Sequence, residues 1–209
     1  MEHKDLTALE RKVVIVIAGL SDNGLAIIRP LVTRGASVVN GDALGVQGED
    51  EGEYRYVTTD VARWLGLLGL YQEAKPTYDP FDHVFANAGL GVRASYLSTQ
   101  LNEKCGPAEL SSQVVDVNLE DVINTSTIVS HRLRKEAGGG GVVFPGLSTG
   151  LQRCRVVDYA AAEHVIHIQR DRLAEIDETV LLVGYGKEVN GKLEPAEDEV
   201  LKRLAAAAA

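Results

Sequence analysis

Short apolar runs alternate with amphipathic stretches along most of the chain. Short strand-like runs predict strands at 12–17, 36–39, 54–61, 81–86 and 142–145. The first run, KVVIVI, is apolar on both faces and is typical of a strand covered on both sides. Helical spacing predicts helices at 25–35, 63–75 and 114–136, with Pro30 expected to kink the first or to remove one of its hydrogen bonds.

Strands that alternate with helices at this spacing indicate βαβ units with right-handed crossovers. The pattern therefore predicts an α/β fold, a doubly wound parallel sheet flanked by helices. A chain of 209 residues that is 45% hydrophobic can build one domain of ordinary size, so we expect a single domain over 1–209.

Charge and composition narrow the classes of function. The net charge of −9 argues against a nucleic-acid partner. No apolar run is long enough for a membrane span, and the charged start MEHKDLTALERK is unlike a signal peptide, so we expect a cytoplasmic protein with no membrane role. Cys105 and Cys154 are expected to be free thiols. The histidines share no ligand spacing, so no metal site is expected.

The turn after the first predicted strand suits a dinucleotide phosphate. It reads IAGLSDNG at 17–24 and leads into a helix, whose amino end favours phosphate. Its candidate binding residues are Gly19, Ser21, Asn23 and Gly24. Asp42, near the end of the second strand, can accept hydrogen bonds from a ribose diol and repel a 2′-phosphate, which favours NAD over NADP. The alternative for Asp42 is a solvated turn aspartate.

Several segments, in order and spacing, resemble the short-chain dehydrogenase/reductase family over Lys12 to His164. Besides the turn and Asp42, they are TTDV at 58–61, ANAG at 86–89, DVNLEDVINTS at 116–126 and DYAAAEH at 158–164. HVFANAGLG and EIDETVLL look like the fungal branch, which includes many enzymes of secondary metabolism. The resemblance implies a Rossmann-like fold, NADP or NAD as cofactor, and a homodimer or homotetramer paired through long helices.

The resemblance also assigns individual cofactor-binding residues. Asp60 and Val61 match the adenine contact of the family, and Asn87, Ala88 and Gly89 match its Asn-Ala-Gly motif. The glycine turn departs from the family: Ile17, Ala18 and Asp22 stand where the family has Thr, Gly and Gly, and Gly24 alone is kept. A carboxylate about 4 Å from a pyrophosphate would cost on the order of 4 kcal/mol unless Asp22 turns outward.

The catalytic group of the family, Asn, Ser, Tyr and Lys, is matched in part. Asn118 and Tyr159 match the Asn and the Tyr, the Ser position is Leu147 with Ser148 beside it as a substitute, and the Lys position is Glu163. A carboxylate there would raise the tyrosine pKa, whereas the lysine lowers it. Asp158 is a candidate replacement acid.

Each of these residues also has a structural interpretation. Tyr159 could be a core tyrosine, Asn118 could hold a helix bend, Ser148 could cap a turn, and Asp158 could be a surface aspartate.

The length of the chain is short for these motifs. His164 is followed by VIHIQ, which alternates like a strand, and no crossover fits between Ala162 and Val165. We therefore expect an internal segment of roughly 60 residues to be absent near 160–165, by analogy with two βα units. If the chain is joined across the absent segment before Glu163, the apparent replacement of the family lysine by glutamate results from that joining and is not a substitution.

These observations predict a divergent short-chain dehydrogenase/reductase-like enzyme of fungal secondary metabolism, with alkaloid pathways as one setting. Its expected partner is a bulky, largely apolar small-molecule metabolite. The expected chemistry is NAD(P)H-dependent reduction of a C=O or C=N bond, or a pocket-guided cyclisation of the Diels–Alderase kind, or both. The alternative is a redox-inactive scaffold or regulatory homologue that retains the fold.

Overall fold

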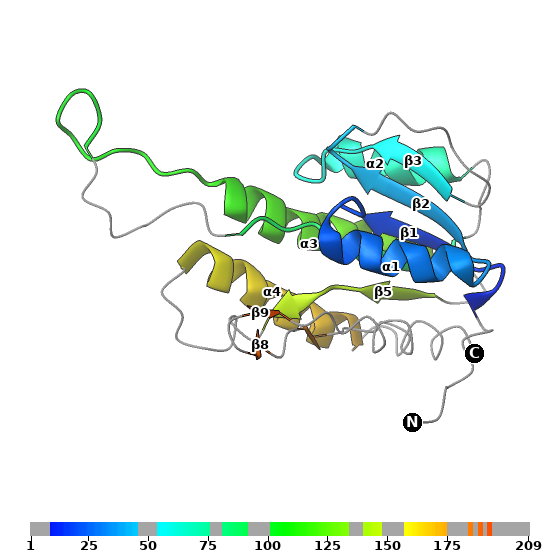
Figure 1. Cartoon of the computed structure of the whole chain (residues 1–209). Helices are drawn as coiled ribbons and strands as arrows, with labels where there is room; N and C mark the ends of the chain where they lie inside the picture. The colour runs from blue at the N-terminus through cyan, green and yellow to red at the C-terminus, as the bar shows by residue number, and fades with distance from the viewer. Residues whose placement is uncertain are drawn as a thin grey trace.

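The computed structural model describes residues 9–45, 54–75, 81–91, 101–133, 140–147 and 157–174, together with three residue pairs near the carboxyl end, 184–185, 188–189 and 192–193. Within these ranges the chain forms one main parallel sheet flanked by helices on both faces (Figure 1). This arrangement confirms the predicted α/β, Rossmann-like fold class.

The main sheet has the strand order β3-β2-β1-β4-β5, and every pairing in it is parallel. Its strands are β1 (Val13–Ile17), β2 (Ser37–Asp42), β3 (Tyr54–Thr58), β4 (His83–Ala86) and β5 (Gly141–Val143). Each coincides with a strand expected from the sequence. Two-residue strands β6 (Gly146–Leu147) and β7 (Gly184–Tyr185) pair in parallel, and β8 (Glu188–Val189) and β9 (Lys192–Leu193) pair antiparallel.

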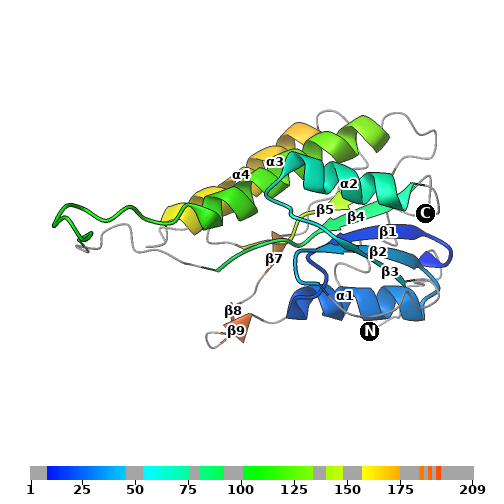
Figure 2. The same cartoon turned by 90° about the horizontal axis from the view of Figure 1, so that it is seen from above.

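The helices divide between the two faces of the sheet (Figure 2). α1 (Asp22–Thr33) covers one face, where Ile27, Ile28 and Leu31 pack on buried residues of β1 and β2. α2 (Trp64–Ala74), α3 (Gln113–Leu133) and α4 (Val157–Ala174) lie on the other face and share a larger core. Pro30 lies inside α1, which nevertheless continues to Thr33. Burial of apolar side chains on both sheet faces explains why β1 and β5 lack a polar face.

The predicted strand at 165–169 is wrong, because this stretch belongs to α4. Ile166 is 6% exposed and Ile168 is 49% exposed, whereas a strand would turn both toward the same face. The helix-forming alanines at 160–162 precede the alternating run, and helix packing against α3 decides the outcome. Tyr159 and Glu163 therefore lie on one helix, one turn apart. The predicted absence of an internal segment stays a prediction.

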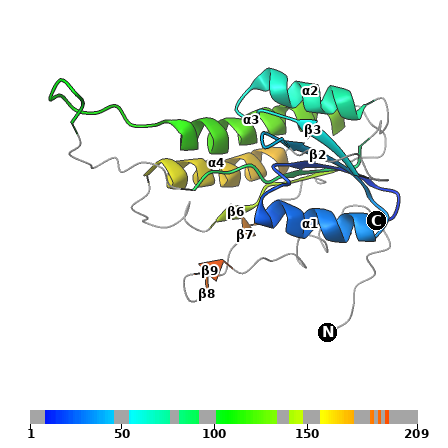
Figure 3. The same ribbon diagram turned by 45° about the horizontal axis from the view of Figure 1, so that its top comes forward.

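The topology changes direction between β1 and β4, which are neighbours in the sheet (Figure 2). Figure 3 shows β2 and β3, which lie on the β1 side of this point. From β1 the connections proceed to β2 and β3 on one side, and from β4 to β5 on the other. In open parallel sheets, ligands bind beyond the carboxyl ends of the strands at such a switch point. Ile17 and Ala86 are paired at this edge, so the turns that follow them position the candidate site.

Candidate functional site

The turn between β1 and α1 needs small residues at two positions. A Cβ on Gly19 would lie 2.4 Å from Asn40 Oδ1, and one on Gly24 would lie 2.5 Å from the Cα of Gly19. The first turn of α1 therefore packs directly on the glycine turn. Ala18 has a φ of +57°, in the left-handed region that L side chains rarely adopt. The strained residue stands where the resemblance places the first family glycine.

Replacing Ala18 by glycine is expected to stabilise the fold by about 0.5–1 kcal/mol. The substitution removes the left-handed penalty of an alanine, about 1–2 kcal/mol, while glycine adds backbone entropy to the unfolded chain. Urea unfolding followed by circular dichroism measures the change. Ala26→Gly, inside α1, is the matched control and should destabilise by about 1 kcal/mol. Destabilisation by Ala18→Gly of the same size as the control would contradict the assigned strain.

Two side chains at the end of β2 bind the backbone of this turn. The Gly19 amide donates to Asn40 Oδ1 at 3.0 Å, and the Leu20 amide donates to Asp42 Oδ2 at 3.0 Å. The other carboxylate oxygen of Asp42 accepts from the Leu44 amide at 2.9 Å. Asp42 is 6% exposed, so the alternative of a solvated turn aspartate is wrong. Its carboxylate is fixed at the edge of the glycine turn.

Sequence reasoning missed Asn40, which is fully buried. Its Nδ2 donates to the Tyr54 hydroxyl at 2.9 Å, so one side chain links the glycine turn to β3. The available signal was a polar residue at the end of an otherwise apolar buried strand. Such a residue needs hydrogen-bond partners when it is buried.

Ser21, Gly24 and Asn87 come together at the amino end of α1. Ser21 is the N-cap, and its Oγ accepts from the Gly24 amide at 3.1 Å. Asn87 Nδ2 donates to Ser21 Oγ at 2.8 Å and to the Ala18 carbonyl at 3.0 Å, which joins the turn after β4 to the glycine turn. Asn23 is exposed on the first turn of α1. α1 begins at Asp22, whose side chain lies outside the described part of the structure.

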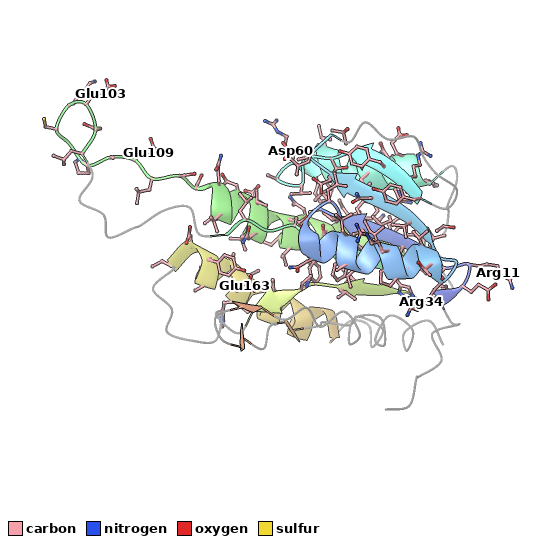
Figure 4. The ribbon with its side chains drawn as sticks, in the orientation of Figure 1. Arg11, Arg34, Asp60, Glu103, Glu109 and Glu163 are labelled. Atoms are coloured by element: carbon pink, nitrogen blue, oxygen red, sulfur yellow. The ribbon has the colours of Figure 1, made fainter. Side chains whose placement is uncertain are left out.

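Asp60 lies beyond the carboxyl end of β3, where the resemblance places an adenine contact (Figure 4). Its Oδ1 accepts from the Ala62 amide, and its Oδ2 pairs with Arg63 Nε at 3.1 Å. Val61 beside it is 9% exposed. Asp60 also borders a cavity of about 760 Å³, a size that suits a small organic ligand. The cavity is lined by Asp60, Ala62, Arg63, Leu90, Gln113, Asp116, Val117 and Glu120.

Asn118 on α3 holds the backbone that follows Ala88 and Gly89. Its Oδ1 accepts from the Leu90 amide at 2.7 Å, and its Nδ2 donates to the Leu90 carbonyl at 3.0 Å. The Asn118 side chain is 6% exposed and satisfies both the backbone N–H and the backbone C=O of Leu90. Asn118 therefore has a structural role in this chain, because it fixes the backbone at Leu90 against α3.

Tyr159 and Glu163 form a pair on α4. The Tyr159 side chain is partly exposed, and Glu163, one turn further along the helix, is 6% exposed. Burial raises the pKa of Tyr159 well above its usual range, and the charge of Glu163 and a hydrogen bond between the two side chains raise it further. The phenol therefore stays protonated throughout the physiological pH range.

Asp158 is not a surface aspartate, because it is 3% exposed. Its Oδ1 accepts from the Tyr159 amide at 2.8 Å in the first turn of α4, where the helix dipole favours negative charge. Ser148 lies outside the described residues, and so do Cys154 and the side chain of Leu147. Cys105 is an exposed free thiol.

The described residues also bear on metal binding and membrane insertion. Among the described residues, no three His, Cys, Asp or Glu side chains gather where they could hold a metal ion. Over the same residues, no helix has the length and apolar character that a membrane span requires.

Comparison with known proteins places the chain in a family. The family model "short chain dehydrogenase" matches residues 12–177. Short-chain dehydrogenase/reductase ascJ of Acremonium egyptiacum is 40% identical over 164 residues, which cover 77% of this chain and 55% of that protein. Short-chain dehydrogenase/reductase prx4 of Penicillium roqueforti is 26% identical over 72% of this chain and 45% of its own length. The chain thus spans about half the length of the curated relatives it matches.

Solved structures agree on the fold. A short-chain dehydrogenase/reductase from Serratia marcescens superposes with a TM-score of 0.72 at 19% identity, over 95% of this chain and 89% of that one. A short-chain dehydrogenase from Leptospira borgpetersenii with bound NAD+ gives a TM-score of 0.74 at 16% identity, over 100% and 90%. With the matched family model and the observed strand order, these findings establish that the chain belongs to the short-chain dehydrogenase/reductase family.

Proposed function

We propose that the protein is a divergent oxidoreductase of fungal secondary metabolism. In this proposal it uses NADH or NADPH to reduce a C=O or C=N bond of a bulky, largely apolar metabolite. The observation that carries the proposal is the set of hydrogen bonds that Asp42, Asn87 and the N-cap Ser21 make around the glycine turn at the switch point of the sheet. Family membership and the bound NAD+ of the Leptospira protein support the same assignment.

The residues present fit the adenosine half of a nicotinamide dinucleotide. Asp42 carries a fixed carboxylate at the end of β2, where it would receive the ribose hydroxyls, and Asp60 borders a cavity that would take the adenine. The amino end of α1 and the close Gly19–Gly24 approach would hold the pyrophosphate. Since the Gly19 and Leu20 amides already bind Asn40 and Asp42, the remaining first-turn amides of α1 would carry that contact.

The state of Tyr159 favours reduction over oxidation. When bound, the cofactor supplies a hydride, and the protein has to supply the proton that neutralises the new oxyanion or amide anion. Tyr159 is protonated at physiological pH and can donate, although its raised pKa makes it a weak acid. Alcohol oxidation needs a tyrosinate, which Glu163 disfavours.

The same pair favours a second candidate function, a pocket-guided cyclisation without hydride transfer. Glu163 occupies the position at which the resemblance places a lysine, so the usual means of activating Tyr159 is missing. A shaped pocket can accelerate a cyclisation through orientation alone. A redox-inactive scaffold is the limiting case, in which neither cofactor nor metabolite binds.

Calorimetric titration with NADH and NADPH tests the proposal and the role of Asp42. We expect saturable binding with a preference for NADH, because the buried carboxylate repels a 2′-phosphate. Asp42→Asn should reduce that preference at least about tenfold, which corresponds to about 1.4 kcal/mol. Glu73→Gln, an exposed position on α2, is the control and should leave both affinities unchanged. Absence of binding by both cofactors would contradict the oxidoreductase assignment.

We also propose that the protein forms a homodimer or homotetramer, as the family resemblance implies. α3 and α4 carry exposed apolar side chains, Ile123 (41%), Val157 (61%) and Ile168 (49%). Pairing of two subunits through these long helices would cover them.

A further inference from the structure

We propose that Arg63 determines the affinity of the cavity beyond β3 for a purine base, by stacking its guanidinium group flat on one face of the ring. The inference rests on the proposed function, because it concerns the cavity that would take the adenine of the cofactor. It gives a role to a residue that the family resemblance leaves without one. The ligand class it implies is a nucleotide with an uncharged purine base.

The turn that carries Arg63 is fixed by its own hydrogen bonds. The Ala62 amide donates to Asp60 Oδ1 at 3.1 Å, and the Arg63 amide donates to the Asp60 carbonyl at 3.2 Å. Gly66, in the first turn of α2, packs on the same turn so closely that a Cβ there would lie 2.3 Å from the Asp60 carbonyl oxygen. The backbone of Arg63 therefore has a set position at the edge of the cavity.

The side chain of Arg63 is oriented as well, although 79% of it is exposed. Its Nε donates to Asp60 Oδ2 at 3.1 Å, and Figure 4 labels Asp60 at its place beyond β3. This hydrogen bond lies in the plane of the guanidinium group, so it uses one edge of the group and leaves its flat faces for stacking. An exposed ion pair adds little to stability, and we assign this one the role of orienting the guanidinium group.

A second part of the cavity lining is apolar and comes from other elements. Leu90 follows β4 and Val117 lies on α3, and both border the same cavity as Arg63. Asn118 holds the backbone of Leu90 through two hydrogen bonds, at 2.7 and 3.0 Å. A flat ring that enters the cavity would therefore meet apolar side chains as well as a planar cation, and both kinds of group bind the face of an aromatic ring.

The charges around the cavity favour a base over a phosphate group. Asp60, Asp116 and Glu120 border it with carboxylates, and Arg63 supplies the one guanidinium group in this lining, as far as the structure describes it. A phosphate group would face these three carboxylates, whereas adenine is uncharged and its amino group can donate to a carboxylate oxygen. Because Arg63 is paired with Asp60, its charge is already balanced. The lining therefore suits the base, and the pyrophosphate would stay at the glycine turn.

Calorimetric titration of the full chain with ADP and with CDP tests the assignment, because these two nucleotides differ only in the base. We expect Arg63→Ala to weaken ADP binding at least about fivefold, a size typical of one lost stacking contact, and to weaken CDP binding less. Arg63→Lys should weaken ADP binding almost as much, since lysine keeps the charge but has no flat surface. The control Arg29→Ala removes the same charge from an exposed site on α1 and should change neither affinity.

The assignment is overturned if the parent does not bind ADP, or if folded Arg63→Ala binds ADP as tightly as the parent. Equal losses for ADP and CDP would also overturn it, because they indicate a contact with the phosphates. Full ADP affinity in Arg63→Lys would show that charge alone matters. NADH titration of the same variants separates the two proposals. NADH affinity that is equal in parent and Arg63→Ala removes only the stacking role, whereas Arg63-dependent ADP binding without NADH binding removes only the oxidoreductase.

Discussion

Replacing Glu163 by lysine is expected to raise NADH-dependent reduction of an aromatic ketone by about a hundredfold. Burial raises the pKa of Tyr159, and the Glu163 carboxylate raises it further through its charge and a hydrogen bond, whereas an ammonium group at that position would lower it. Positioned general acids contribute about 10²–10⁴ in rate, so restoring a competent acid should recover part of that range. Steady-state consumption of NADH measures the change.

Two variants control this prediction. Glu163→Gln removes the negative charge without adding a positive one, so it should give a smaller increase than lysine. Glu10→Lys makes the same charge change at an exposed site before β1 and should leave the rate unchanged. If lysine and glutamine at position 163 give equal rates, the electrostatic argument fails even when both variants are folded.

Asp121→Asn is expected to stabilise the protein by up to about 4 kcal/mol at pH 8. Asp121 is fully buried on α3, and burial raises its pKa from 3.8 to about 7 despite the hydrogen bond that Thr125 Oγ1 donates to Oδ1 at 3.1 Å. Its Oδ2 has no hydrogen-bond partner among the described residues. Burial first and the Asp121 charge second raise the pKa of the nearby Tyr71 hydroxyl. Asparagine keeps the shape and removes the buried charge.

The sign of the pH dependence follows from proton counting. Between about pH 4 and pH 7 the folded protein keeps the Asp121 proton and the unfolded chain has lost it, so the folded state binds more protons. Stability from this group therefore falls as pH rises through that window, and the three-unit shift corresponds to about 4 kcal/mol. The advantage of Asp121→Asn should vanish near pH 4 and be complete above pH 8.

Urea unfolding at several pH values measures this difference between variant and parent. The difference is needed because burial lowers the pKa of His83 to about 4, which gives the parent an opposing slope between pH 6.5 and 4. Asp116→Asn, on the partly exposed side of the same helix, is the control for the change from carboxylate to amide itself. A stabilisation that is constant from pH 5 to pH 8 would contradict the buried charge.

The sheet could be predicted from the sequence because short local patterns of residues indicate its strands. β1 and the start of β2 are short β-branched runs closed by turn signals, and parallel strands buried on both faces need no polar face. The strand prediction for 165–169 was wrong because it, too, used only local pattern. Five residues of alternating pattern fit either element, and the burial of Ile166 against the α3 side of the core, which decides between them, is a tertiary contact.

The site could be predicted only in part. The residues of the glycine turn and Asn87 follow from spacing, and the structure brings them together. Asn40 could not be assigned, because its partners Gly19 and Tyr54 come from different strands and turns. The fixed carboxylate of Asp42 likewise depends on two amides that the fold alone places beside it. Hydrogen bonds across elements are visible only after the strand order is known.

The titration of Tyr159 tests the central claim most directly, namely that Glu163 controls the phenol proton. Tyrosine labelled with carbon-13 at Cζ gives a resonance that shifts when the phenol ionises, and comparison with Tyr159→Phe assigns it. In the parent protein we expect the Tyr159 signal to stay unshifted through pH 11, because burial and Glu163 raise its pKa. In Glu163→Gln the midpoint should fall. A midpoint near pH 10 in both proteins would contradict the coupling and, with it, the proposed chemistry of the site.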